Sequence, residues 1–168
     1  MAHKLVPGDD HMKKGTWKNY AFWIALSEAV GGLSAWLTRD AMKTYSQTVV
    51  QPPLSPPMWL FPVAWSILYA LMGIGAARVR LSPPSPQRSR GINLFVAQLV
   101  VNFFWSLIFF NARAYGFALL WLLLLWGLVL WMTLTFRKAD KAAAWLQIPY
   151  LLWLAFAAYL NYGVWRLN

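Results

Sequence analysis

The chain has 168 residues, of which 60% are apolar and only 12% are charged, and it contains no Cys. A soluble domain of this length usually has about a quarter of its residues charged, so a soluble enzyme and a disordered chain are excluded, and the lack of Cys excludes a disulfide scaffold. The apolar excess predicts a protein embedded in lipid.

Basic residues outnumber acidic residues by 15 to 5 and give a formal net charge of +10. They lie in short gaps between long uncharged runs and form neither a stripe nor a recognition motif, so no nucleic-acid partner is expected. Cationic gaps between apolar runs are instead typical of membrane proteins, in which they set the topology and contact anionic lipid.

Residues 1–12 contain no apolar core and end in a second Met, so we interpret them as a remnant of cloning rather than a signal peptide. Residues 13–168 are expected to form a single membrane domain. A helix that crosses a hydrocarbon core of ~30 Å needs roughly 20 residues, and five apolar runs satisfy this length. The predicted spans are 19–38, 58–77, 92–112, 115–136 and 142–165. The predicted fold is an all-α, integral membrane bundle of five transmembrane helices with a long first loop acting as a lid.

The segments between the runs predict the topology. Residues 39–55 form the longest gap, and a loop of this length is more often a lid or a binding segment than a spacer. Residues 80–90 are rich in Pro, Ser and Arg and cannot be helical throughout. Arg113 lies in a very short connection, so the third and fourth spans should be antiparallel neighbours. Eleven Lys and Arg fall on the side of the N-terminus and four on the other, which predicts a cytoplasmic N-terminus.

Prolines mark the start of two spans. Pro52 and Pro53 hold the chain extended, and Ser55 is placed to cap a helix with Pro at its first position. Both a fixed lid and a stiff turn that merely enters a helix fit this pattern. Pro62 in the second span and Pro149 in the fifth are each expected to interrupt their helix about one turn after its start.

The 12 Trp are more than an aromatic belt at the membrane surface requires, because several lie nearer the middle of a span. An indole N–H or an amide at that depth needs a partner inside the bundle. The side chains predicted to point inward are Trp65, Gln98, Asn102, Trp153 and Asn161. From the residues alone, they could equally line a ligand pocket or bond across helices.

Glu28 is the only acidic residue inside a predicted span. It could be a functional acid such as a proton site, but the small residues around it favour close helix packing and an interhelical hydrogen bond. The chain offers no Cys, no His outside residues 1–12 and no carboxylate pair within a span. No metal site, no nucleophile–base dyad and no obligatory cofactor are therefore predicted.

Three motifs occur in order along the chain. The first is Pro52-Pro53-Leu54-Ser55-Pro56-Pro57-x-Trp59-x-Phe61-Pro62-x-x-Trp65-x-x-Leu68-Tyr69-x-x-Met72-Gly73. The second is Gln98-Leu-x-x-Asn102-x-x-Trp105-Ser106-x-x-Phe109-Phe110. The third runs from Pro149-Tyr150 through Trp153, Ala157 and Asn161 to Arg166. Together they resemble the signature of the TspO/MBR family, the tryptophan-rich sensory proteins and the mitochondrial translocator protein, over residues 18–168.

The resemblance implies a homodimer, in a bacterial cell membrane, with a pocket closed by the first loop. Family members bind porphyrins such as protoporphyrin IX, benzodiazepine-type ligands and, in some cases, cholesterol, and some degrade protoporphyrin in light. The implied function is a membrane receptor or scavenger for porphyrins and related hydrophobic ligands, with a transporter of porphyrin or sterol as the alternative. Trp65 and Trp153 match the tryptophans of the light reaction, and Asn102 matches the amide expected to hold a ligand carbonyl.

The ligand-binding residues expected on this basis are Phe61, Trp65, Tyr69, Gln98, Asn102, Trp105, Phe109, Tyr150, Trp153 and Ala157. The residues that fit the sterol-recognition pattern of the family are Leu160, Tyr162 and Arg166.

The lid residues implied by the resemblance are Pro52, Pro53 and Leu54. Two departures concern this lid, because Gln51 and Leu54 stand where the family usually has Lys and Trp. The lid therefore lacks one cation and one ring. The carboxylates of a bound porphyrin are expected to reach the outer rim, near Arg39 or Lys43.

Overall fold

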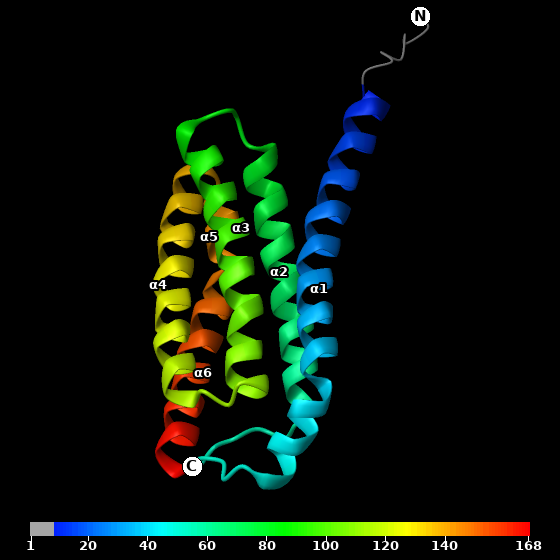
Figure 1. Cartoon of the computed structure of the whole chain (residues 1–168). Coiled ribbons are helices and arrows are strands. Elements are labelled where there is room, and N and C mark those ends of the chain that lie inside the picture. The colour runs from blue at the N-terminus through cyan, green and yellow to red at the C-terminus, as the bar shows by residue number, and fades with distance from the viewer. Residues whose placement is uncertain (1–8) are drawn as a thin grey trace, which may run out of the picture.

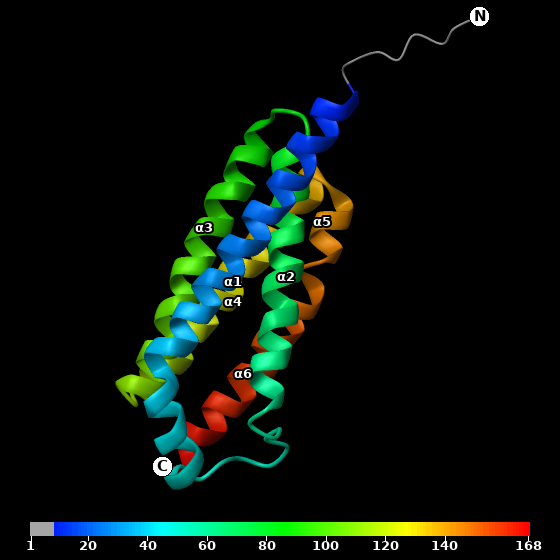
Figure 2. The same ribbon diagram turned by 90° about the vertical axis from the view of Figure 1, so that its right-hand side faces the viewer.

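The computed structural model describes residues 9–168, which form helices and no strand. In chain order the helices are α1 (Asp9–Thr48), α2 (Leu60–Leu81), α3 (Pro86–Ser106), the π-helical turn η1 (Leu107–Asn111), α4 (Tyr115–Ala139), α5 (Lys141–Trp145) and α6 (Ile148–Leu167). Figures 1 and 2 show α1 lying along α2 at the edge of the bundle. The segment interpreted as a cloning remnant lies largely outside the described residues, so that interpretation stays a prediction.

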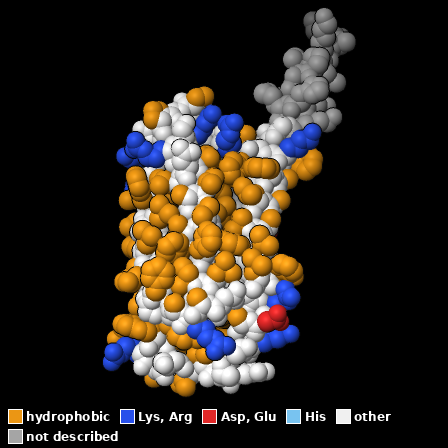
Figure 3. Space-filling model, in the orientation of Figure 1, with side chains coloured by type: hydrophobic (Ala, Val, Ile, Leu, Met, Phe, Trp, Pro, Cys, Tyr) orange, Lys and Arg blue, Asp and Glu red, His pale blue; other side chains and the backbone are white. Residues whose placement is uncertain are grey.

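Five stretches of the described chain are long and apolar enough to cross a membrane: Gly15–Thr48, Leu60–Leu81, Pro86–Asn111, Tyr115–Ala139 and Lys141–Leu167. Each corresponds to one predicted span, which confirms the all-α, five-span fold. Figure 3 shows hydrophobic side chains covering the middle of the molecule, while Lys and Arg gather toward its two ends. Trp17, Trp59 and Trp145 are exposed, as expected for a belt at the membrane surface.

The first helix extends ten residues beyond the predicted end of its span, so the proposed loop over 39–55 is wrong. The helix ends at Thr48, and the chain that joins it to α2, called here the connecting segment, covers only residues 49–59. Residues 39–48 contain neither Pro nor Gly, and the hydroxyls of Thr44 and Thr48 donate to the carbonyls of Asp40 and Thr44. Charged residues end the apolar run but do not end a helix that can continue into water.

The start of the second helix also differs from the prediction. The helix begins at Leu60, and no side chain caps it. The hydroxyl of Ser55 donates instead to the carbonyl of Pro52 at 2.8 Å, within the connecting segment. Pro62 is consequently the third residue of the helix, where a missing N–H removes no helical hydrogen bond, so the predicted interruption does not occur.

The fifth span is interrupted near Pro149, as predicted. Its two parts, α5 and α6, meet at Leu146 and Gln147, and Pro149 is the second residue of α6. The side chain of Gln147 is fully buried and its amide donates to the carbonyl of Ala143. Gly75 of α2 faces this amide, because a Cβ at that position would overlap it. The break is thus packed against a glycine of the neighbouring helix.

The remaining connections follow the prediction. Residues 82–85 interrupt the helices between α2 and α3, and Ser85 caps α3 by accepting from the backbone N–H of Arg88. Residues 112–114 join η1 to α4, with Arg113 in the left-handed region at φ 51°. The third and fourth spans are packed along each other as antiparallel neighbours, which Figure 1 shows.

Asp140 joins three elements at the end of the molecule that carries the α2–α3 loop. Its carboxylate accepts from the backbone N–H of Ala143 at 2.8 Å, which caps α5, and pairs with the Arg78 guanidinium of α2 at 2.9 Å. Burial alone would raise the pKa of Asp140, but the Ala143 hydrogen bond and Arg78 outweigh it and hold the pKa below its ordinary value.

This carboxylate should make stability depend on acid. Because the folded-state pKa is lowered, the stabilisation is fully present above the unfolded-state pKa of about 4 and is lost as pH falls through the folded value. Asp140→Ala is expected to cost about 1–2 kcal/mol at pH 7, as lost helix caps do, and Asp140→Asn less. Thermal unfolding in detergent between pH 7 and pH 3 checks this. An Asp140→Ala variant as stable as the wild type at pH 7 would contradict it.

Candidate functional site

A cavity of about 230 Å³ lies near the end of the bundle that carries the connecting segment. Figure 2 shows α1 and α2 separating toward this end, with α6 visible between them. The lining residues are Gly31, Ser34, Ala35, Thr38, Met42 and Tyr45 of α1, Met58 of the connecting segment, Phe61, Pro62, Trp65 and Tyr69 of α2, Trp105 and Ser106 of α3, Phe109 and Phe110 of η1, and Trp153, Ala157, Leu160 and Asn161 of α6.

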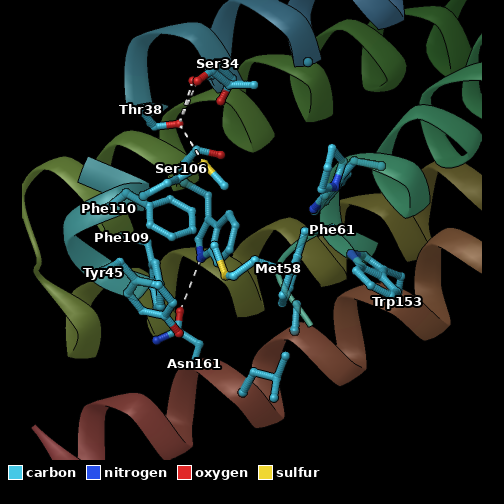
Figure 4. Close-up of a pocket in the computed structure, with 18 of the residues that line it drawn as sticks. Ser34, Thr38, Tyr45, Met58, Phe61, Ser106, Phe109, Phe110, Trp153 and Asn161 are labelled. Carbon is cyan, nitrogen blue, oxygen red and sulfur yellow. Dashed lines mark hydrogen bonds between the residues drawn. The ribbon is translucent and has the colours of Figure 1, made fainter. Parts of the chain in front are cut away.

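Aromatic rings form most of the cavity wall. The rings of Trp65 and Trp153 meet edge to face with centroids 6.3 Å apart, and Phe61 packs edge-on against Trp153 at 6.1 Å. On the opposite side, Trp105 and Phe109 are stacked at 5.2 Å. Figure 4 shows Phe61 and Trp153 facing Phe109 and Phe110 across the hollow. Rings on opposite walls present faces and edges on which a flat aromatic molecule can pack.

The π-helical turn η1 explains the position of two of these rings. A π turn contains more residues than an α-helical turn, so successive side chains are rotated by less than the roughly 100° of an α-helix. This changes the directions in which the rings of Phe109 and Phe110 point. Phe109 is buried and stacks on Trp105, while Phe110 contacts Tyr45 of α1 edge-on at 5.3 Å. The turn therefore connects the α3 wall of the cavity to the α1 wall.

The α1 wall was missed by sequence reasoning. The small residues of α1 were interpreted as sites of close helix packing. Gly31 does pack closely, since a Cβ there would overlap the ring of Tyr69. The same small residues also leave room in front of them, so Gly31, Ser34 and Ala35 line the cavity. The stripe of small side chains was the available signal, but it does not by itself distinguish packing from an empty space.

A network of buried polar side chains lies beneath the cavity. The hydroxyl of Tyr69 donates to Asn102 at 2.8 Å, and the amide of Asn102 donates to the hydroxyl of Tyr150 at 2.6 Å. The Tyr150 hydroxyl donates in turn to Gln98 at 2.9 Å. All four side chains are buried. They tie α2, α3 and α6 together, and only Tyr69 belongs to the cavity lining.

Three predicted ligand-binding residues therefore do not line the cavity. Gln98 and Asn102 point inward, as predicted, but both bond to the buried hydroxyl of Tyr150 across helices. The predicted residues that do line it are Phe61, Trp65, Tyr69, Trp105, Phe109, Trp153 and Ala157. Asn161, which was expected to point inward, also lines it and accepts from the indole N–H of Trp105 at 3.3 Å.

The connecting segment is fastened to α6 rather than folded into the cavity. Val50 and Asn168 exchange two hydrogen bonds, and the hydroxyl of Tyr159 donates to the carbonyl of Pro53 at 2.9 Å. Pro52 is buried against Gly163, where a Cβ would overlap its ring. The expected lid residues are thus not part of the lining, and Leu54, at φ 67°, is 81% exposed. Met58 is the residue of this segment that reaches the cavity.

Gly163→Ala is expected to release the connecting segment. The added methyl would collide with the rigid Pro52 ring, so the segment must leave α6 and cleavage within residues 49–59 should become several-fold faster. Limited proteolysis in detergent measures this. Gly127→Ala of α4 is the matched control, because a Cβ there has no atom within 4 Å. Equal cleavage rates in the two variants would show that the Pro52–Gly163 contact does not hold the segment.

Among the residues that the structure describes, no charged side chain lines the cavity. Arg39 pairs with Asp40 at 3.8 Å and lies over the ring of Trp36, which is exposed, and Lys43 is exposed as well. Glu28 makes no hydrogen bond or ion pair with any residue that the structure describes, so the favoured interhelical bond is wrong. The cavity therefore offers polar contacts but no countercharge.

The sterol-recognition residues do not come together. Leu160 is buried and lines the cavity, whereas Tyr162 and Arg166 are exposed on the other side of α6. Tyr162 and Arg166 follow Leu160 by two and six residues, which are rotations of about 200° and about 240° around the helix axis. Their separation from Leu160 therefore follows from helical geometry. The three side chains cannot hold one ligand on a single surface.

Five hydrogen-bond donors on the lining have no partner among the described residues. They are the hydroxyls of Ser34, Tyr45 and Ser106 and the indole N–H groups of Trp65 and Trp153. Ser34, Thr38 and Ser106 lie on one wall in Figure 4, opposite Phe61 and Trp153, and the Thr38 hydroxyl is already bonded to the Ser34 carbonyl. The site can thus receive an uncharged, flat molecule that carries hydrogen-bond acceptors.

Comparisons with known proteins agree with this architecture. The model of the TspO/MBR family matches residues 23–166. The tryptophan-rich protein TspO of Chlorobaculum tepidum is 36% identical over 149 residues, covering 88% of this chain and 94% of its own. The human translocator protein is 39% identical over 120 residues, 70% and 71% of the two chains. The tryptophan-rich sensory protein of Cereibacter sphaeroides is 32% identical over 152 residues, 90% and 92% of the two chains.

The match spans all five membrane helices and the connecting segment, and several of these relatives are covered over most of their length. The protein is an integral, multi-pass membrane protein. It is a member of the TspO/MBR family.

Proposed function

We propose that this protein is a membrane receptor or scavenger that binds porphyrins, with protoporphyrin IX as the representative ligand, in the cavity between α1, α2, η1 and α6. The observation that carries the proposal is the edge-to-face pair of Trp65 and Trp153, which faces the stacked Trp105 and Phe109 across an uncharged hollow. Stacking and apolar burial are the interactions that a porphyrin macrocycle can use.

The size of the cavity constrains how such a ligand would enter. A volume of about 230 Å³ is below the roughly 300–1,000 Å³ of sites for drug-sized ligands. A macrocycle would therefore insert one edge between the tryptophans, or α1 would move away from α2 to admit more of it. Either arrangement leaves the carboxylates of protoporphyrin IX outside the aromatic walls.

The absence of charge from the lining predicts that the carboxylates contribute little to affinity. Burying an unpaired carboxylate is costly, so the dimethyl ester of protoporphyrin IX should bind at least as tightly as the free acid. Arg39→Gln and Lys43→Gln should change the affinity for the free acid by less than about threefold, as expected of exposed charges. An ester that binds tenfold more weakly than the acid would show that a cation reaches the ligand.

The proposal includes light-dependent degradation of the bound porphyrin. Light would excite the macrocycle, oxygen would be the oxidant, and Trp65 and Trp153 would supply or intercept radicals because they lie against the ring. Titration of the purified protein with protoporphyrin IX, followed by tryptophan fluorescence, tests binding. Absorbance of the complex under illumination tests degradation. Quenching no stronger than that of free tryptophan at equal concentration would refute the binding site.

Transport of porphyrin or sterol is the alternative function. The Tyr69–Asn102–Tyr150 network closes the inner end of the cavity, and Met72 and Phe95 fill the interior beyond it. A site with one closed end favours a receptor over a transporter. Flux of protoporphyrin into sealed vesicles that contain the protein separates the two, since a receptor gives binding without flux.

The cellular setting belongs to the same proposal. The excess of Lys and Arg on the side of the N-terminus supports a cytoplasmic N-terminus, and the similarity to bacterial relatives supports a bacterial cell membrane. The homodimer implied by the family resemblance is part of the same proposal.

A further inference from the structure

A second crevice lies on the outside of the bundle, toward the end opposite the connecting segment. It is formed where α3 begins and α4 ends, and its volume is about 230 Å³. The lining residues are Gln87 and Arg90 of α3 and Trp131, Leu134, Thr135 and Lys138 of α4. Figure 1 shows this end of α3 and α4 beside the α2–α3 loop, and Figure 3 shows Lys and Arg gathered there.

Two cations of this crevice lack a countercharge. Arg90 and Lys138 are exposed, and neither makes an ion pair or a hydrogen bond with any residue that the structure describes. Asp140, an acidic residue that the structure describes at this end, is already paired with Arg78. Arg88, by contrast, donates to the carbonyl of Ser82 at 2.9 Å. The positive charge of the crevice is therefore free to attract an anion.

The part of the crevice that is nearer the middle of the membrane is apolar. Trp131 and Leu134 are 55% and 52% exposed, one turn apart on the outer face of α4. Lys138 lies seven residues beyond Trp131, or about 10 Å along a helix, so the cation stands nearer the membrane surface than the indole. A free anion would contact only the two cations, whereas a lipid could contact the cations with its headgroup and the apolar side chains with an acyl chain.

We propose that this crevice binds an anionic phospholipid, with Arg90 and Lys138 on the headgroup phosphate and Trp131 and Leu134 along the start of an acyl chain. Gln87, in the first turn of α3, adds an amide donor at the same level. The backbone N–H groups at the start of α3 contribute further positive potential. Basic pockets between membrane helices are the places where anionic headgroups bind.

Lipid-dependent stability tests this site. The protein is purified in detergent, and its thermal unfolding is followed while phosphatidylglycerol, phosphatidylcholine or inorganic phosphate is added. We expect stabilisation by phosphatidylglycerol alone. The variant Arg90→Gln/Lys138→Gln should bind phosphatidylglycerol roughly thirty-fold more weakly, since each basic residue contributes about a factor of five.

The matched control is Arg80→Gln/Arg137→Gln, which removes two exposed cations from the same end but outside the crevice. It should retain the wild-type response, while Trp131→Ala should weaken the phospholipid effect. Equal losses in the two double variants would show a diffuse charge effect and overturn the site. Stabilisation by inorganic phosphate equal to that by phosphatidylglycerol would overturn the lipid as its occupant, and no preference over phosphatidylcholine would overturn the proposal altogether.

Discussion

Gly73→Ala is expected to destabilise the bundle by about 2–3 kcal/mol, the upper part of the range for overpacked cores. A Cβ at Gly73 would lie 2.5 Å from the Cα of Ile24 and 2.8 Å from the carbonyl oxygen of Trp23. These are backbone atoms, which no rotamer change can move. Since α1 packs mainly against α2, the whole helix would have to shift.

The measurement is thermal unfolding in one detergent, with Gly32→Ala as the control. Gly32 lies on α1 and a Cβ there has no atom within 4 Å, so the control should be as stable as the wild type or more stable by up to about 1 kcal/mol. Because α1 forms one wall of the cavity, Gly73→Ala should also weaken porphyrin binding. Equal stability of the two variants would mean that α1 and α2 are not in the close contact described.

Trp65→Leu and Trp153→Leu are each expected to weaken protoporphyrin IX binding by about tenfold, the effect of losing one favourable ring contact. Trp65→Phe and Trp153→Phe keep a ring, so they should bind the porphyrin with a smaller loss. They remove the indole, however, and should slow bleaching of the bound porphyrin in light several-fold. This difference between affinity and bleaching separates a photochemical role from simple stacking.

The control for these variants is Trp145→Phe, since Trp145 is 74% exposed and is not part of the cavity lining. Binding and bleaching are measured on the same samples, by fluorescence titration in the dark and by porphyrin absorbance under illumination. If Trp145→Phe slowed bleaching as much as Trp65→Phe and Trp153→Phe, the reaction would not occur between the two cavity tryptophans.

The number and type of helices could be predicted from the sequence because the length of an apolar run and the thickness of a membrane are linked by simple geometry. The end of α1 could not, because hydropathy marks where lipid ends and not where a helix ends. Residues 39–48 are polar enough to leave the membrane and lack any residue that breaks a helix. The predicted lid was consequently too long, and the connecting segment is held on α6 instead.

The candidate site could be predicted only in part, for a related reason. Depth in the membrane predicted that Trp65, Asn102 and Trp153 point inward, and they do, but depth does not determine what an inward side chain meets. The amide of Asn102 bonds to two tyrosine hydroxyls, whereas Trp65 and Trp153 border an open space. The difference arises from partners 33 and 48 residues away in sequence, which periodicity within one helix cannot reveal.

An experimental structure of the protein with protoporphyrin IX bound, determined in a lipid environment, tests the ligand site most directly. The macrocycle is expected to have one edge between Trp65 and Trp153, with Trp105 or Phe109 on its other side and its carboxylates directed out of the cavity. A macrocycle seated on the lipid-facing surface of the bundle, with the tryptophan pair unchanged and the cavity empty, would contradict it.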